Sequence, residues 1–91
     1  MKFIYPAIFR QDTDGLYHGY FPDLDDCLST GETLDDAREN ANEAACNWLS
    51  VELEEGGHLP PVSDPSDLTL KEGEIIRNIA ANIRLFEGYD E

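Results

Sequence analysis

The acidic side chains are the first candidates for chemistry in this chain of 91 residues, which has twenty Asp and Glu but only six Lys and Arg. The run Asp12-x-Asp14-Gly15 is similar to the opening of a calcium-binding loop, but it lacks the third oxygen ligand that precedes the glycine in such loops. We therefore expect a turn here and no metal site, with the Asp side chains accepting hydrogen bonds from local amides and Gly15 adopting a positive φ.

Hydrolytic chemistry has little support in the residue pattern. Ribonuclease H-type hydrolysis needs several inward-pointing carboxylates that hold two metal ions, but residues 3–10 and 16–21, the two expected N-terminal strands, contain no Asp or Glu. His18 and His58 are 40 residues apart, and no Ser or Cys motif marks an activated nucleophile beside either of them. We expect no enzymatic activity, no catalytic residue and no cofactor.

The net charge of −14 bears on the class of partner. Proteins that bind nucleic acids gain affinity from Lys and Arg side chains that neutralise phosphates, so direct binding of DNA or RNA is not expected. The same negative field attracts a basic partner and raises its rate of encounter. A basic protein is therefore a better candidate partner than a nucleic acid.

The cysteines and the apolar segments indicate a reducing, aqueous compartment. Cys27 and Cys46 show neither C-x-x-C nor metal-binding spacing, so we expect two reduced thiols. No stretch approaches the roughly 18 apolar residues of a membrane span, and Pro6 interrupts the first apolar run too early for a signal peptide. We expect a cytoplasmic protein.

Alternating apolar residues predict strands in the first third of the chain. Residues 3–9 carry apolar side chains at both odd and even positions, which suits a strand that is covered on both sides or lies at a self-association surface. Pro6 argues that one backbone edge of this strand is free. Residues 16–21 return as the second strand of a hairpin, and residues 28–30 can form a short third strand.

One long helix follows the third strand. Thr33 is the expected N-cap, and Asp35 and Asp36 favour the positive end of the helix. Gly56-Gly57 ends the helix after about Glu54 or Glu55. The stripe that faces the sheet, with Trp48 as its large anchor, consists of Leu34, Ala37, Ala41, Ala44, Ala45 and Trp48.

The last third of the chain contains a loop and a segment of ambiguous period. Residues 59–67 are rich in Pro and Ser and are expected to form an irregular crossing. Residues 74–86 fit both a strand and a helix, and their Ile content favours the strand. The expected fold is α+β, with a three-stranded antiparallel sheet, one long helix and a fourth strand (βββαβ) in a single domain of residues 1–91.

Several short motifs follow one another in a distinctive order and spacing: Tyr5-Pro6-Ala7-Ile8-Phe9, Asp14-Gly15, Phe21-Pro22-Asp23-Leu24, Cys27, Thr30-Gly31-Glu32-Thr33-Leu34-Asp35-Asp36-Ala37, and Gly56-Gly57-His58-Leu59-Pro60-Pro61. Taken in this order, they resemble the HicB family, the antitoxins of the HicAB toxin–antitoxin modules. The resemblance covers residues 3 to about 66 well and the last quarter of the chain loosely. It implies a partial ribonuclease H-like fold, although a fold by itself carries no activity.

The resemblance also implies a function. It predicts an antitoxin that binds and neutralises a small, basic, mRNA-cleaving toxin of the HicA type by covering its active surface. The candidate partner-binding residues, three aromatic anchors and three acids on the outer face of the helix, are Tyr17, Tyr20, Phe21, Asp36, Glu39 and Glu43. A homo-oligomer, either a dimer or a tetramer, is expected because so short a chain buries only a modest fraction of its surface.

The chain departs from the family pattern at two places. Many relatives carry Pro-Gly where this chain has Asp25-Asp26, so the loop before Cys27 is expected to differ in shape. Relatives that repress their own operon have a C-terminal DNA-binding segment, whereas only five residues follow Phe86 here. Autoregulatory DNA binding is therefore not expected, unless residues 75–86 form a swapped ribbon in a dimer.

Two alternative functions stay open at this point. One is an orphan oligomeric module that binds another protein or a small ligand. The other, which is less favoured, is an unusual hydrolase on a ribonuclease H-like scaffold, for which Asp23 and Asp26 would be the acids to test.

Overall fold

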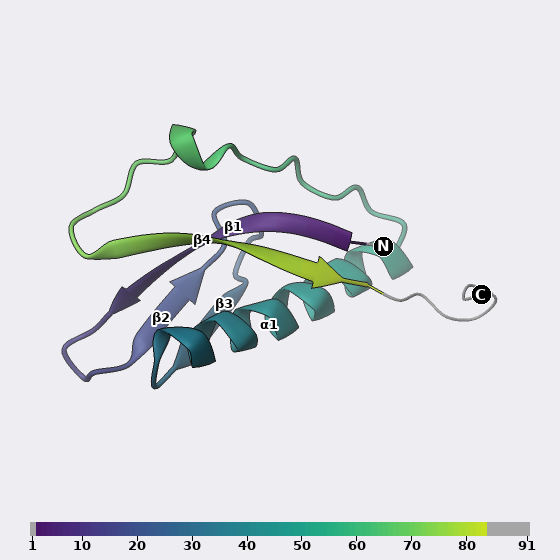
Figure 1. Cartoon of the computed structure of the whole chain (residues 1–91). Helices are drawn as coiled ribbons and strands as arrows, with labels where there is room; N and C mark the ends of the chain where they lie inside the picture. Colours follow the sequence, from purple (N-terminus) through teal and green to yellow (C-terminus); the bar gives the residue numbers. More distant parts are fainter. Residues whose placement is uncertain (1, 84–91) are drawn as a thin grey trace.

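The computed structural model describes residues 2–83 and shows a four-stranded antiparallel sheet with one long helix packed on one face (Figure 1). Along the sheet the strand order is β3-β2-β1-β4. The elements are β1 (Lys2–Gln11), β2 (Tyr17–Tyr20), β3 (Leu28–Gly31), α1 (Leu34–Glu54), the short 3₁₀ helix η1 (Pro65–Asp67) and β4 (Glu74–Asn82). The predicted α+β class and the βββαβ order are confirmed.

β1 is an inner strand that is buried on both faces over its central residues. Tyr5, Ala7 and Phe9 belong to the core beneath α1, whereas Pro6 and Ile8 point to the opposite face and are also buried. β2 pairs with β1 only from Ile8 onward, so within residues 2–83 no strand lies beside Pro6 on that edge. The structure confirms that residues 3–9 are covered on both faces and that one backbone edge is free at Pro6. A free edge suits a proline, because proline has no amide hydrogen to donate to a neighbouring strand.

The turn between β1 and β2 has the predicted conformation. The Gly15 amide donates to the Asp12 carbonyl oxygen over 2.9 Å, and the Leu16 amide donates to Oδ1 of Asp14 over 2.9 Å. Gly15 has a φ of 86°, and it adopts this conformation without steric strain because it has no Cβ. The hairpin therefore closes through one local backbone hydrogen bond and one hydrogen bond to the Asp14 carboxylate.

β4 resolves the ambiguity of the C-terminal segment in favour of a strand. It pairs antiparallel with β1 in a register that runs from Lys2 with Asn82 to Arg10 with Glu74. Ile79 and Ala81 enter the core on the side of α1. The part of the predicted strand from Arg84 to Phe86 lies outside the described residues.

α1 lies close to the sheet because its inner face is built from small residues. Ala37, Ala41 and Ala45 are fully buried, as is Leu49. The predicted cap is confirmed, since the Asp36 amide donates to the Thr33 hydroxyl over 3.0 Å. The prediction that Trp48 is the large anchor of this stripe is confirmed only in part, because Trp48 packs against the core but is only half-buried. The large side chain of α1 that is fully buried is Leu49, which was not assigned to the stripe.

Two asparagine side chains of α1 hold the edge strands of the sheet. The Asn40 amide donates to the Thr30 carbonyl oxygen of β3 over 2.7 Å. The Asn42 amide donates to the Ala80 carbonyl oxygen of β4 over 2.6 Å. The helix therefore fixes both sides of the sheet by hydrogen bonds as well as by apolar packing. Of the helices within residues 2–83, none has the length and apolar character needed to cross a membrane.

The segment between α1 and β4, residues 55–73, forms a strap that runs along the molecule on the side away from the middle of α1 (Figure 1). Leu59 packs against the core, and the Tyr5 hydroxyl donates to the Pro60 carbonyl oxygen over 2.6 Å. The Asp23 carboxylate accepts from the Ser63 amide over 2.8 Å and from the Ser63 hydroxyl over 2.6 Å. The strap thus has little regular structure but is fixed at several points.

We predict that Gly31→Ala destabilises the fold. A Cβ at this position would lie 2.7 Å from the carbonyl carbon of Asp36, so the backbones of β3 and α1 would have to separate. The expected loss of unfolding free energy in urea is about 1–3 kcal/mol. Gly57→Ala is the control, because a Cβ there meets only the flexible carboxylate of Glu52. Equal losses in the two variants would contradict the close packing of helix and sheet.

We also predict that the Tyr5 phenol makes the fold sensitive to alkali. Burial, and to a smaller extent the Asp23 carboxylate, raise the pKa of Tyr5 above the ordinary value of 10.0. The unfolded chain therefore loses this proton at a lower pH than the folded chain, and the free energy of unfolding falls as the pH rises from about 10 through the raised pKa.

Unfolding measured between about pH 8 and about pH 11 tests this effect, because Tyr5→Phe removes the titrating group. The variant should lose about 0.5–1.5 kcal/mol at the lower pH, since the bond to Pro60 is gone. Above pH 10.0 its stability should decline less steeply than that of the wild type. Parallel pH curves for the two proteins would show that Tyr5 is not the responsible group.

Candidate partner-binding surface

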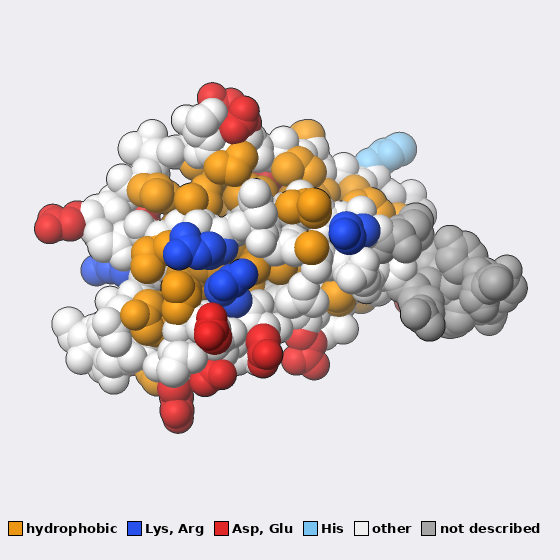
Figure 2. Space-filling view, viewed as in Figure 1, with side chains coloured by type: hydrophobic (Ala, Val, Ile, Leu, Met, Phe, Trp, Pro, Cys, Tyr) orange, Lys and Arg blue, Asp and Glu red, His pale blue; other side chains and the backbone are white. Residues whose placement is uncertain are grey.

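The three predicted acids lie together on the outer face of α1. Asp36, Glu39 and Glu43 are all exposed, and we call this set the acidic ridge. Figure 2 shows acidic side chains along the lower margin of the molecule, where Figure 1 places α1, while basic side chains lie over the middle of this view among apolar ones. Only one basic residue interrupts the first two turns of the helix, and this residue, Arg38, makes an ion pair of 3.8 Å with Asp35.

The three predicted aromatic anchors do not lie together on one surface. Phe21 is 3% exposed and belongs to the core, so we correct its assignment as a contact residue. Tyr17 packs against the same core from the side of α1. Tyr20 points to the opposite face of the sheet and is 41% exposed. Side chains alternate between the faces of a strand, which is why neighbouring aromatics in β2 separate.

A groove that the sequence did not reveal lies between β3 and α1, beside the acidic ridge. We call it the edge groove; its volume is about 470 Å³. Leu28 on β3 is 65% exposed and Val51 on α1 is 52% exposed, which is unusual for such large apolar side chains. The residues that line the groove are Asp26, Cys27, Leu28, Ala44, Asn47, Trp48, Val51 and Glu52.

Hydrogen bonding and burial hold the floor and wall of the edge groove in place. The Trp48 indole Nε1 donates to the Asp25 carbonyl oxygen over 2.9 Å, which ties α1 to the loop before β3. Cys27 is buried, and burial raises the pKa of its thiol, so it remains a neutral apolar surface at physiological pH. Asp26 adopts a φ of 59°, the left-handed conformation that a glycine takes easily. The loop therefore has a glycine-like conformation at Asp26 although it carries two acids.

The charges around the edge groove are negative. Asp26 and Glu52 line it directly, and Glu43 of the acidic ridge immediately precedes Ala44 in its wall. An apolar centre with an aromatic residue and a charged rim is the usual anatomy of a protein–protein interface. The arrangement suits a partner that presents apolar side chains surrounded by basic ones.

One feature of the sequence indicates this groove, although we assigned the apolar residues of the helix only to the stripe that faces the sheet. Val51 follows Trp48 by three positions and Ala44 by seven, so these residues extend the apolar arc of the helix beyond the sector that one sheet can cover. An apolar arc that is too wide for its sheet indicates a second contact. Leu28 had no comparable signal, since its exposure depends on β3 being an edge strand.

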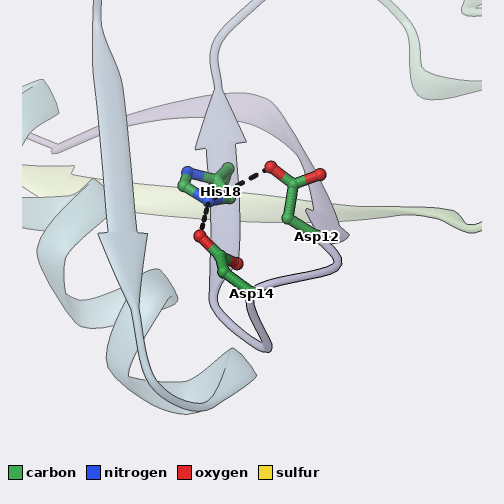
Figure 3. A group of neighbouring side chains, drawn as sticks. All are labelled: Asp12, Asp14 and His18. Carbon is green, nitrogen blue, oxygen red and sulfur yellow. Dashed lines mark ion pairs between the residues drawn. The ribbon is translucent and has the colours of Figure 1, made fainter.

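A second hollow lies on the face of the sheet opposite α1. It has a volume of about 310 Å³, and its lining includes Ile8, Tyr20 and Leu28. We call it the sheet hollow. On its rim the His18 ring meets the carboxylates of Asp12 and Asp14, which project from the turn between β1 and β2 (Figure 3).

The acids considered for a hydrolase are occupied or isolated. Asp23 accepts two hydrogen bonds from Ser63 and serves to hold the strap. Asp26 is exposed at the turn before β3. Within residues 2–83, the group of metal-ligating side chains that comes together is Asp12, Asp14 and His18 instead. The structure therefore gives no support to a site built on Asp23 or Asp26.

Comparison with known families decides where the chain belongs. The model of the HicB-like antitoxins of bacterial toxin–antitoxin systems matches residues 5–83. The chain belongs to the HicB-like antitoxin family. Membership confirms the resemblance noted above and supports an antitoxin role. No relative was found among curated protein sequences.

Solved structures of similar fold agree with this assignment. The chain is 25% identical to the N-terminal domain of the Burkholderia pseudomallei antitoxin HicB, with a TM-score of 0.78, 89% of this chain and 100% of that chain covered. It is 32% identical to a chain of the HicA3 and HicB3 toxin–antitoxin complex, with a TM-score of 0.66 and coverage of 91% and 100%. A chain of a toxin–antitoxin complex from Streptococcus pneumoniae is 25% identical, with a TM-score of 0.82 and coverage of 90% and 70%.

Proposed function

We propose that this chain binds and neutralises a small, basic, mRNA-cleaving toxin of the HicA type, without enzymatic activity of its own. The observation that carries the proposal is the family match over residues 5–83. Two solved structures that share its fold are described as toxin–antitoxin complexes, which supports the same conclusion. The partner is therefore a protein and not a nucleic acid, in keeping with the net charge of −14.

The toxin is proposed to sit on the edge groove, with the acidic ridge at the margin of the contact. Leu28, Trp48 and Val51 supply apolar area that is exposed or half-buried in the free chain. Burying such area provides most of the affinity of an interface, while charges at the rim chiefly tune the association rate and the choice of partner. We therefore expect the edge groove to set the affinity for the toxin and the acidic ridge to set the rate of encounter with it.

The predicted homo-oligomer is proposed to use a different surface from the toxin. Tyr20 and Ile4 are 41% and 46% exposed on the face of the sheet opposite α1. Two copies meeting there would bury apolar side chains while keeping their acidic ridges apart, which limits the repulsion between chains of like charge. Except at Leu28, which lines both hollows, the edge groove would stay open for the toxin.

Co-expression of the chain with the neighbouring small open reading frame tests the proposed function. Growth rescue together with co-purification of a stable complex is the expected result. A toxic neighbour that is neither bound nor neutralised would contradict the proposal and favour an orphan oligomeric module. Expressing the neighbour alone is the required control, because rescue has meaning only when that product arrests growth.

We predict that polar substitutions in the edge groove weaken the toxin complex without unfolding the chain. Leu28→Ser and Val51→Ser each remove exposed apolar area, so each should raise the dissociation rate about tenfold, which corresponds to about 1.4 kcal/mol. Val62→Ser is the matched control, because Val62 is 57% exposed but lies on the strap. Surface-captured toxin gives the rates directly, and a control that loses as much affinity would disprove the assignment of the groove.

We predict that reversing charge on the acidic ridge slows association. The double variant Glu39→Lys/Glu43→Lys should lower the association rate severalfold at low salt and less at high salt, because screening removes long-range attraction. The control Asp67→Lys/Glu72→Lys changes the net charge equally, but both of its residues are exposed on the strap. Indistinguishable association rates for the two double variants would exclude the ridge as part of the contact.

A further inference from the structure

Three metal-ligating side chains meet at the rim of the sheet hollow, which lies on the face of the sheet opposite α1. Nε2 of His18 lies 3.4 Å from Oδ2 of Asp12 and 3.6 Å from Oδ2 of Asp14. One ligand atom from each of the three residues lies within 4.8 Å of the other two. Figure 3 shows that both carboxylates approach the same edge of the ring. Their separation in sequence is short, but only the return of β2 beside β1 brings the ring to the turn.

The two distances from His18 Nε2 are compatible with the geometry of a bound transition metal. Tetrahedral zinc with bonds of about 2.0–2.2 Å places neighbouring ligand atoms about 3.3–3.6 Å apart. Both distances from His18 Nε2 fall in or next to this range. The two carboxylates repel one another, and a divalent cation between them would draw them together. One imidazole with two carboxylates also suits Zn²⁺ better than Mg²⁺ or Ca²⁺, which prefer oxygen ligands alone.

Two further features concern the His18 ring itself. Nε2 is buried and makes no hydrogen bond, although the side chain as a whole is 43% exposed, so this nitrogen faces the carboxylates rather than water. On the other side of the ring, Nδ1 lies 3.5 Å from the Thr30 hydroxyl of β3. A proton on Nδ1 shared with Thr30 would leave the Nε2 lone pair directed at the two carboxylates. Histidine ligands of metals usually have such a partner on their other nitrogen.

We propose that Asp12, Asp14 and His18 form a binding site for Zn²⁺, with Thr30 as a positioning residue and water in the open coordination position. The site goes beyond the proposed antitoxin function and does not depend on it. A bound ion would join the start of β2 to the turn that follows β1 and would replace the repulsion between two acids by attraction. The chain should then be more stable with zinc than without it, because an ion that binds only the folded state stabilises that state.

Calorimetric titration of the full chain with Zn²⁺, prepared without a histidine tag, tests the site. Wild-type protein should bind one equivalent, and Co²⁺ in its place should give the visible absorption of a tetrahedral site. His18→Gln should weaken zinc binding at least about tenfold, and Thr30→Val should weaken it about tenfold through the ring orientation alone. His58→Gln is the matched control, because it removes the other histidine of the chain, and it should bind as the wild type does.

Several outcomes would overturn the proposal. Absence of zinc binding in the wild type would show that the three side chains only contact one another and hold no metal ion. Equal binding by His18→Gln and His58→Gln would assign the zinc to the acidic surface in general. Circular dichroism and melting of each variant without metal identify any that fail to fold, and Asp14→Asn then provides a second, independent test of the site.

Discussion

The close approach of α1 to the sheet is the constraint on which the rest of the structure depends. Ala37, Ala41 and Ala45 leave no room between helix and strands, and Gly31 is a position where any side chain would collide with the helix backbone. Such packing density is ordinary for a protein interior. In this protein the close packing fixes the rotation of α1 about its own axis, and this rotation determines which side chains of the helix reach the surface.

That rotation connects the fold to the proposed function. With Leu49 directed into the sheet, Trp48 and Val51 are displaced to the side where β3 ends the sheet, and the edge groove follows from this displacement. The acids of the ridge are turned to solvent beside the groove. One helix on a four-stranded sheet thus presents an apolar centre and an acidic margin together, and a basic protein is the partner that such a surface suits.

Local patterns predicted much of this fold. The cap at Thr33, the turn at Gly15 and the hairpin are all determined by residues near in sequence, and each was found as expected. The predictions that failed concerned the direction in which single side chains point, not the type of element to which they belong. Phe21, which follows directly after β2, is buried in the core, and the meeting of His18 with the acids of the turn depends on the register of β1 with β2. The ribonuclease H-like character, the single domain and the oligomeric state stay predictions.

The most direct test of the central claim uses the single tryptophan of the chain, Trp48. In ¹⁵N-labelled protein its indole gives one resolved signal from the wall of the edge groove, and unlabelled toxin can be titrated against it. The account predicts that this signal and that of Val51 shift on binding, while Tyr20 on the opposite face is unaffected. A complex that forms with the Trp48 signal unchanged and with shifts confined to the sheet hollow or β4 would contradict it.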